Sequence, residues 1–70
     1  MFPDRLKTAS NAKNLTQKIV ADYLNITLKA YQHYEYDVRK PPFENIIKLC
    51  QLLEVSSDWL LGLSDVRERR

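Results

Sequence analysis

The stretch TQKIVADYLNITLKAYQHYEY, from Thr16 to Tyr36, decides the fold. Thr16 and Thr27 each precede an apolar pattern of helical period, and a threonine hydroxyl at such a position accepts a hydrogen bond from a free backbone N–H of the next turn. We therefore predict one helix over residues 17–24 and a second over residues 28–36. Because only three residues separate them, the two helices cannot lie antiparallel and must cross at a steep angle.

The apolar side chains of this stretch fall on one face of each predicted helix. In the first helix that face carries Val20, Ala21 and Leu24, and in the second it carries Tyr31 and Tyr34. Between the helices, Asn25 suits a backbone turn, since asparagine tolerates a positive φ better than most residues. These faces predict a shared core beneath the turn.

The rest of the chain also has the helical period. We predict helices over residues 3–13, 43–54 and 57–61, separated by loops at Asn14, Pro41-Pro42 and Ser56 and ended by Gly62. The helix over 43–54 has the broadest apolar stripe, formed by Phe43, Ile46, Ile47, Leu49, Cys50 and Leu53. The predicted fold is an all-α, compact five-helix domain over residues 1–64, followed by a flexible basic tail over residues 65–70.

Composition narrows the classes of function. The chain has 70 residues, 44% of them hydrophobic, and a net charge of only +2, so it forms a single small domain and its overall charge is weak evidence for a nucleic-acid partner. A single cysteine, Cys50, excludes an intrachain disulfide, and its apolar surroundings favour a core position. No apolar run approaches the ~20 residues that a membrane span needs, so we expect a cytoplasmic protein.

Neither catalysis nor a bound group is indicated. The sequence has no glycine-rich phosphate loop, no carboxylate pair with an identifiable role and no nucleophile–base set, so an enzyme is not expected. The one histidine, His33, has neither a second histidine nor a cysteine cluster with which to hold a metal. We therefore expect no metal, no cofactor and no small-molecule ligand.

Taken in order, the chain resembles the lambda-repressor-like (Xre/Cro-type) helix-turn-helix DNA-binding family over about residues 5–62, without a gap. The resemblance is carried by Arg5-Leu6-Lys7, Leu15-Thr16-Gln17, Val20-Ala21-Asp22-Tyr23-Leu24-Asn25-Ile26-Thr27, Tyr34-Glu35, Arg39-Lys40-Pro41, Lys48-Leu49 and Val55-Ser56-Ser57-Asp58-Trp59-Leu60-Leu61-Gly62.

The sequence departs from the usual family pattern at four positions. Asn25 and Asp37 stand where glycine is usual, and Tyr31 stands where isoleucine or valine is usual. Ser10 stands where many members carry an arginine that pairs with the glutamate matching Glu35. Glu35 is therefore either exposed, bonded to a hydroxyl, or paired with another base.

The resemblance implies that the second helix of the motif enters the major groove of double-stranded DNA. Once the inward Tyr31 and Tyr34 are set aside, the side chains implied to contact bases are Thr27, Leu28, Lys29, Gln32 and His33. Those implied to contact phosphates are Gln17, Lys18, Arg39 and Lys40. As alternatives, Lys29 could be a solvated helix charge, Leu28 could pack on a neighbouring turn, and Arg39-Lys40 could be a solvated loop pair.

The resemblance further implies a homodimer on a palindromic operator. Its expected interface is formed by Trp59, Leu60, Leu61 and Leu63, which are more apolar groups than one short helix can hide. The implied function is a sequence-specific transcriptional regulator, most typically a phage- or mobile-element-type repressor. A protein-interaction module or antitoxin-like partner on the same scaffold is the alternative, favoured by the low net charge and by Asp22, Glu35 and Asp37. A basic stripe along Gln17, Lys29, Arg39 and Lys40 would support DNA binding.

Overall fold

The computed structural model describes residues 1–68 and, within them, has five helices and no strand. The helices are α1 (Phe2–Ala12), α2 (Gln17–Leu24), α3 (Leu28–Glu35), α4 (Phe43–Leu53) and α5 (Ser57–Leu60). The predicted all-α, five-helix fold is confirmed, and each predicted helix boundary lies within one residue of the observed one. None of these helices is long and apolar enough to cross a bilayer.

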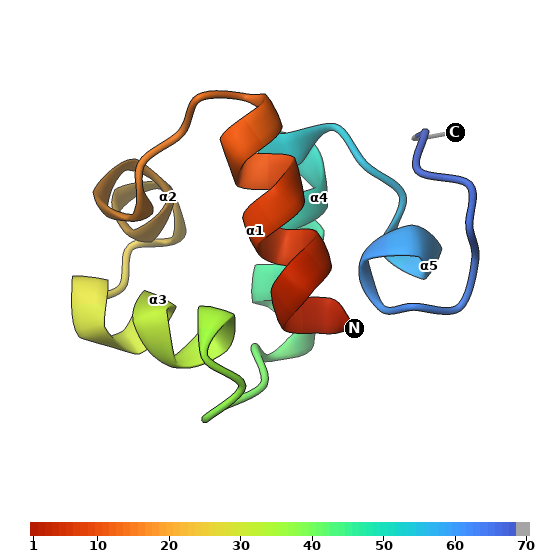
Figure 1. The fold of residues 1–70 in the computed structure, drawn as a ribbon. Coiled ribbons are helices and arrows are strands. Elements are labelled where there is room, and N and C mark those ends of the chain that lie inside the picture. Colours follow the sequence, from red (N-terminus) through yellow and green to blue (C-terminus); the bar gives the residue numbers. More distant parts are fainter. Residues whose placement is uncertain (69–70) are drawn as a thin grey trace.

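The helices α2 and α3 form one end of the molecule, and α5 with the following segment forms the other (Figure 1). Between the two ends, α1 packs against α3 and α5, while α4 packs against α2 and α5. Figure 1 shows α2 nearly end-on and α3 from the side, so the two helices cross steeply, as their short connection predicts. The pair formed by α2 and α3 therefore lies at one end of the domain, where α1 packs against α3 and α4 packs against α2.

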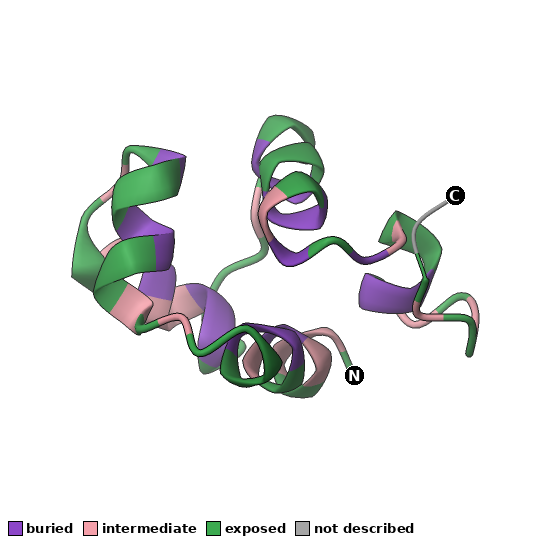
Figure 2. Cartoon of the chain, turned by 90° about the horizontal axis from the view of Figure 1, so that it is seen from above, coloured by how far each residue is buried: buried purple, intermediate pink, exposed green. Residues whose placement is uncertain are grey.

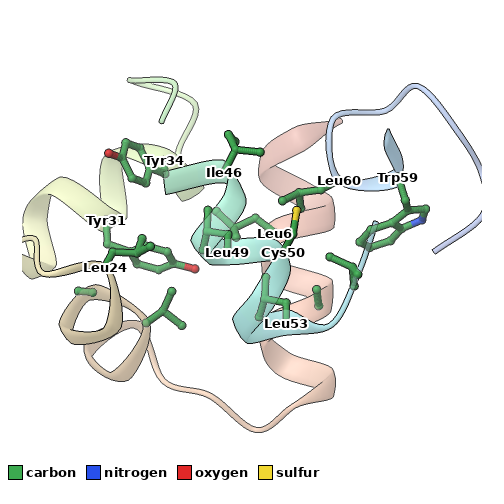
Figure 3. Close-up of a cluster of buried hydrophobic side chains, with 14 residues drawn as sticks. Leu6, Leu24, Tyr31, Tyr34, Ile46, Leu49, Cys50, Leu53, Trp59 and Leu60 are labelled. Carbon is green, nitrogen blue, oxygen red and sulfur yellow. The ribbon is translucent and has the colours of Figure 1, made fainter. Parts of the chain in front are cut away.

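Every helix contributes to one core (Figure 3). Tyr31 and Tyr34 of α3 both point into it, as predicted, and their rings meet edge to face with centroids 6.4 Å apart. Cys50 is buried there too. The buried apolar side chains are Leu6, Ala9, Val20, Ala21, Leu24, Tyr31, Tyr34, Ile46, Leu49, Cys50, Leu53, Val55, Trp59 and Leu60.

Four non-glycine residues at helix ends adopt the left-handed conformation, with φ between 55° and 60°. Asn25 does so where the sequence predicts it, and Asn14 does so in the predicted loop after α1. Asp37 adopts the same conformation at the position where glycine is usual in the family. The fourth is Glu54, the residue that ends α4. Asparagine and aspartate tolerate this backbone because their short polar side chains can hydrogen-bond locally.

The apolar stripe predicted for α4 is wrong at two positions. Phe43 is 79% exposed and Ile47 is 42% exposed, whereas Ile46, Leu49 and Leu53 are buried. Ile47 lies roughly 100° around the helix from Ile46, on the flank of the buried stripe. Phe43 is the first residue of α4, and most of its side chain lies outside the core.

The segment after α5 runs back along the domain. The backbone N–H and the hydroxyl of Ser56 donate to the carbonyls of Arg67 and Val66, each at 3.0 Å, and Val55 forms an antiparallel bridge with Glu68. Part of the predicted flexible tail, residues 65–68, thus lies against the residues that precede α5. The remainder, residues 69–70, lies outside the described residues.

Candidate nucleic-acid interface

The connection between α2 and α3 is held by its own hydrogen bonds. The hydroxyl oxygens of Thr16 and Thr27 accept from the backbone N–H groups of Ile19 (3.2 Å) and Ala30 (3.1 Å), so both predicted N-caps are confirmed. Asn25 turns the chain with φ of 58°, after which the N–H of Ile26 donates to the carbonyl of Ala21 at 3.0 Å. Local bonds therefore fix where α3 begins and in which direction it leaves.

The outer face of α3 consists of the residues that the core does not use. Leu28 and Lys29 are exposed, Gln32 and His33 are half-buried, and Thr27 is exposed at the start of the helix. Figure 2 shows this division along the chain, with buried segments turned toward the centre and exposed ones outward. The structure thus brings the five residues implied to contact bases together on or beside one helix.

A chain of hydrogen bonds connects this outer face with the interior. The Nε2 group of Gln32 donates to Oε1 of Gln17 at 3.1 Å, and Nε2 of Gln17 donates to Oε1 of Glu35 at 3.0 Å. The other carboxylate oxygen of Glu35 accepts from the hydroxyl of Tyr31 at 2.6 Å. Four side chains from α2 and α3 therefore form one network, which the pattern of the sequence does not predict as a whole.

Glu35 is 6% exposed and receives two hydrogen bonds, so of the three alternatives left by the sequence, a bond to a hydroxyl is confirmed. The hydroxyl belongs to Tyr31, one of the residues that departs from the family pattern. Ser10 donates its own hydroxyl to the carbonyl of Leu6 at 2.9 Å. The sequence contained a signal for this pair, because Tyr31 and Glu35 are four residues apart on a helix and so share a face.

The Tyr31 hydroxyl remains a donor at physiological pH. Burial of the ring, followed by the hydrogen bond and the negative charge of Glu35, raises the pKa of Tyr31 far above its usual value. A carboxylate can only accept hydrogen bonds, so the protonated hydroxyl is the matching partner. The network consequently has a fixed direction, from donors on Tyr31 and Gln17 to acceptors on Glu35.

The cationic side chains near the motif are exposed. Lys29, Arg39 and Lys40 form no ion pair among residues 1–68, while Lys18 lies 3.5 Å from Asp22 in a pair that is exposed on both sides. An exposed i, i+4 pair of this kind contributes little and separates easily. Backbone N–H groups of Val38 and Arg39 donate to the carbonyl of His33, which turns the loop carrying Arg39 and Lys40 back past the end of α3.

The predicted dimer surface needs correction. Trp59 is 8% exposed and Leu60 is fully buried, so both belong to the core of the domain and offer little or no surface to a second chain. Arg5 lies over the Trp59 ring and donates to the carbonyls of Trp59 (2.5 Å) and Ser64 (2.7 Å), which fixes α5 against α1. Leu61 and Leu63, by contrast, are exposed.

Within residues 1–68, no group of three or more histidine, cysteine, aspartate or glutamate side chains is placed to hold a metal ion. One hollow lies between α4, α5 and the segment after it, and it is lined by Ile47, Cys50, Val55, Ser56, Ser57, Asp58, Ser64, Val66 and Glu68.

Relatives of this chain are transcriptional regulators by name. It is 43% identical over 61 residues to the uncharacterized HTH-type transcriptional regulator YqaE of Bacillus subtilis, covering 87% of this chain and 53% of that protein. It is 39% identical over 59 residues to the cryptic phage CTXphi transcriptional repressor RstR of Vibrio cholerae, covering 84% of this chain and 53% of that protein. The chain spans about half the length of the curated relatives it matches.

A crystal structure of a transcriptional regulator from Listeria innocua has the same fold. The two superpose with a TM-score of 0.83 at 26% sequence identity, over 100% of this chain and 64% of the other. The helix-turn-helix family model matches residues 6–60, which include α2, the turn and α3. On these grounds the chain belongs to the lambda-repressor-like helix-turn-helix family.

Proposed function

We propose that this chain is the DNA-binding part of a transcriptional regulator and that it recognises a specific double-stranded sequence with α3 in the major groove. The observation that carries the proposal is the two-sided character of α3. Its inner face is anchored in the core by the buried Tyr31 and Tyr34. On its outer face Lys29 is exposed, and Gln32 and His33 are half-buried. A helix of this kind fits a major groove about 12 Å wide.

The base contacts are assigned to the start and outer face of α3. Lys29 suits the O6 and N7 acceptors of guanine, and Leu28 suits a thymine methyl group. Gln32 and His33 are placed to hydrogen-bond base edges one turn further along. Thr27 uses its hydroxyl oxygen to cap the helix, which leaves its hydroxyl hydrogen as a donor at the helix entry.

The phosphate contacts are assigned to two flanking segments. Gln17 is the first residue of α2, where free backbone N–H groups and the positive end of the helix dipole favour an anion, and Lys18 follows it. On the other side of α3, Arg39 and Lys40 stand in the loop before α4. Such contacts supply most of the affinity for DNA and little of the sequence preference.

The acidic residues near the motif do not weigh against a polyanionic partner. Glu35 is buried and hydrogen-bonded, and Asp22 lies beside Lys18. Of these three residues, Asp37 alone is exposed and forms no ion pair within residues 1–68. A surface built in this way favours nucleic acid over a basic protein partner.

By extension from the relatives named as regulators and as a phage repressor, the chain would act in the cytoplasm as a phage-type repressor. It would bind a palindromic operator as a homodimer through the exposed Leu61 and Leu63. Half-sites in such operators lie about one helical turn, ~34 Å, apart.

The test is selection of bound duplexes from a random pool, followed by binding measured at several salt concentrations. We expect an enriched, two-fold symmetric motif. The logarithm of affinity should fall linearly with the logarithm of salt, by about 0.9 for each phosphate contacted. A pool that yields no enriched sequence, or an affinity that does not depend on salt, would contradict the proposal.

A further inference from the structure

The hydrogen-bond network between Glu35 and Gln32 has a direction that bears on which base Gln32 can bind. Glu35 is buried and its carboxylate can only accept, so the side of Gln17 that faces it must be the amide nitrogen. The oxygen of Gln17 is thereby turned toward Gln32, so Gln32 must donate a hydrogen bond to it from its own amide nitrogen. The buried charge thus determines the orientation of two side-chain amides in succession.

The orientation leaves Gln32 with a defined set of free groups. An amide nitrogen carries two hydrogens, and one of these is used by Gln17. What remains for a partner is one donor on Nε2 and the acceptor Oε1. Adenine offers the complementary pair in the major groove, an N7 acceptor beside an N6 donor, whereas guanine offers two acceptors, N7 and O6.

We propose that Glu35 is a positioning residue for base specificity: through Gln17 it holds Gln32 in the orientation that favours adenine over guanine. This inference rests on the proposed function, since it concerns the base that α3 meets. If the network is broken, both hydrogens of the Gln32 amide become free, and the side chain can also serve the two acceptors of guanine. Preference for adenine should then decline without loss of the remaining contacts.

Two substitutions in the network distinguish its effect on the orientation of the Gln17 amide from its effect on the stability of the domain. The hydroxyl of Tyr31 binds the carboxylate oxygen that Gln17 does not use. Tyr31→Phe therefore removes a buried hydrogen bond but leaves Glu35 an acceptor, and the Gln17 amide keeps its orientation. Glu35→Gln, in contrast, replaces one acceptor by a donor of nearly the same shape. Either end of the Gln17 amide can then find a partner, so its orientation is no longer fixed.

The experiment compares the sequences selected from a random duplex pool by the wild-type chain and its variants. Gln32→Ala identifies the position in the selected site that Gln32 contacts, since adenine enrichment should be lost there. At that same position, we expect Glu35→Gln to lower the ratio of adenine to guanine by about tenfold, the range that one bidentate contact provides. Tyr31→Phe should keep the wild-type ratio although the domain is less stable.

The matched control is Glu54→Gln, which removes the same charge from a carboxylate that is paired with Lys13, away from α3. It should leave the selected sequences unchanged. If Glu35→Gln is too unstable to select with, Gln17→Met interrupts the network at its middle residue and should lower the same ratio, together with a uniform loss of affinity from its phosphate contact.

Three results would overturn the inference, and they are distinguishable. If the wild-type chain enriches no sequence, the proposed function itself is contradicted. A wild-type motif that survives Gln32→Ala unchanged shows that Gln32 contacts no base. A motif in which Glu35→Gln and Gln17→Met both keep the wild-type ratio of adenine to guanine shows that Glu35 acts on stability alone.

Discussion

At the scale of single residues, the buried carboxylate of Glu35 is the feature that most constrains the domain. A carboxylate removed from water is costly unless its lone pairs are hydrogen-bonded. Here Tyr31 and Gln17 supply those bonds, at 2.6 Å and 3.0 Å. Tyr31 therefore has two roles, since its ring fills the core and its hydroxyl serves the charge.

Tyr31→Phe should lower the free energy of unfolding by about 1.5–3 kcal/mol at neutral pH, because a hydrogen bond to a charged group is lost. The loss should shrink in alkali. The pKa of Tyr31 is raised on folding, so its stabilising contribution is complete below the pKa of the unfolded chain, about 10, and falls as pH rises above that value. Above that pH the wild type should lose about 1.4 kcal/mol per pH unit relative to the variant. Urea unfolding between about pH 9 and pH 11 measures both effects.

The control for this comparison is Tyr36→Phe, since Tyr36 is 57% exposed. Its effect should stay within about 0.5 kcal/mol at every pH. Equal pH dependence in the wild type and Tyr31→Phe would contradict the account of the Glu35 site.

Only part of this residue-scale chemistry could be predicted from the sequence. Helical spacing placed Tyr31 inward, and the serine at position 10 left Glu35 either exposed, bonded to a hydroxyl or paired with another base. The partner Tyr31 lies four residues before Glu35 on α3, so helical spacing indicates it. The second partner, Gln17, lies on α2, and no spacing along one helix contains its distance from Glu35. The contact between Gln17 and Gln32 depends on the same distances, so it could not be predicted either.

At the scale of the helices, α4 shows where a periodic pattern overstates burial. Its predicted stripe had six apolar residues, but the neighbouring helices α2 and α5 cover a narrower face. The pattern correctly gave the centre of that face, because Ile46, Leu49 and Leu53 repeat at helical spacing. It could not give its width, which depends on how closely other helices approach.

Phe43→Ala and Leu49→Ala test this difference within one helix. Phe43 is 79% exposed and Leu49 is fully buried. We expect Phe43→Ala to change the free energy of unfolding by less than about 0.5 kcal/mol and Leu49→Ala to lower it by about 2–5 kcal/mol. The measurement is urea unfolding of both variants, and similar costs for the two would contradict the observed burial.

At the scale of the whole molecule, contacts between the two chain ends are what the sequence pattern missed. Arg5 of α1 binds the carbonyls of Trp59 and Ser64, more than 50 residues away. Arg67 lies on the same Trp59 ring, with its guanidinium carbon 5.1 Å from the ring centre. These long-range contacts bury Trp59, so this residue belongs to the core and not to the exposed surface that the sequence predicted.

The remaining candidates for self-association are Leu61 and Leu63, which are 45% and 77% exposed. The double variant Leu61→Ser, Leu63→Ser should unfold at nearly the same urea concentration as the wild type and should weaken self-association in sedimentation equilibrium. Val38→Ser removes an apolar side chain of intermediate exposure, 63%, from the loop after α3 and serves as the control. A wild-type chain that stays monomeric at high micromolar concentration would contradict this surface as the dimer interface.

The central claim is that α3 supplies sequence preference while the flanking cations supply general affinity. It is tested most directly by binding of Lys29→Ala and Arg39→Ala to the selected duplex and to a duplex of the same composition in shuffled order. Lys29→Ala should reduce the ratio of the two affinities by about tenfold, and Arg39→Ala should weaken binding to both duplexes alike. Equal losses on both duplexes from both substitutions would contradict the claim.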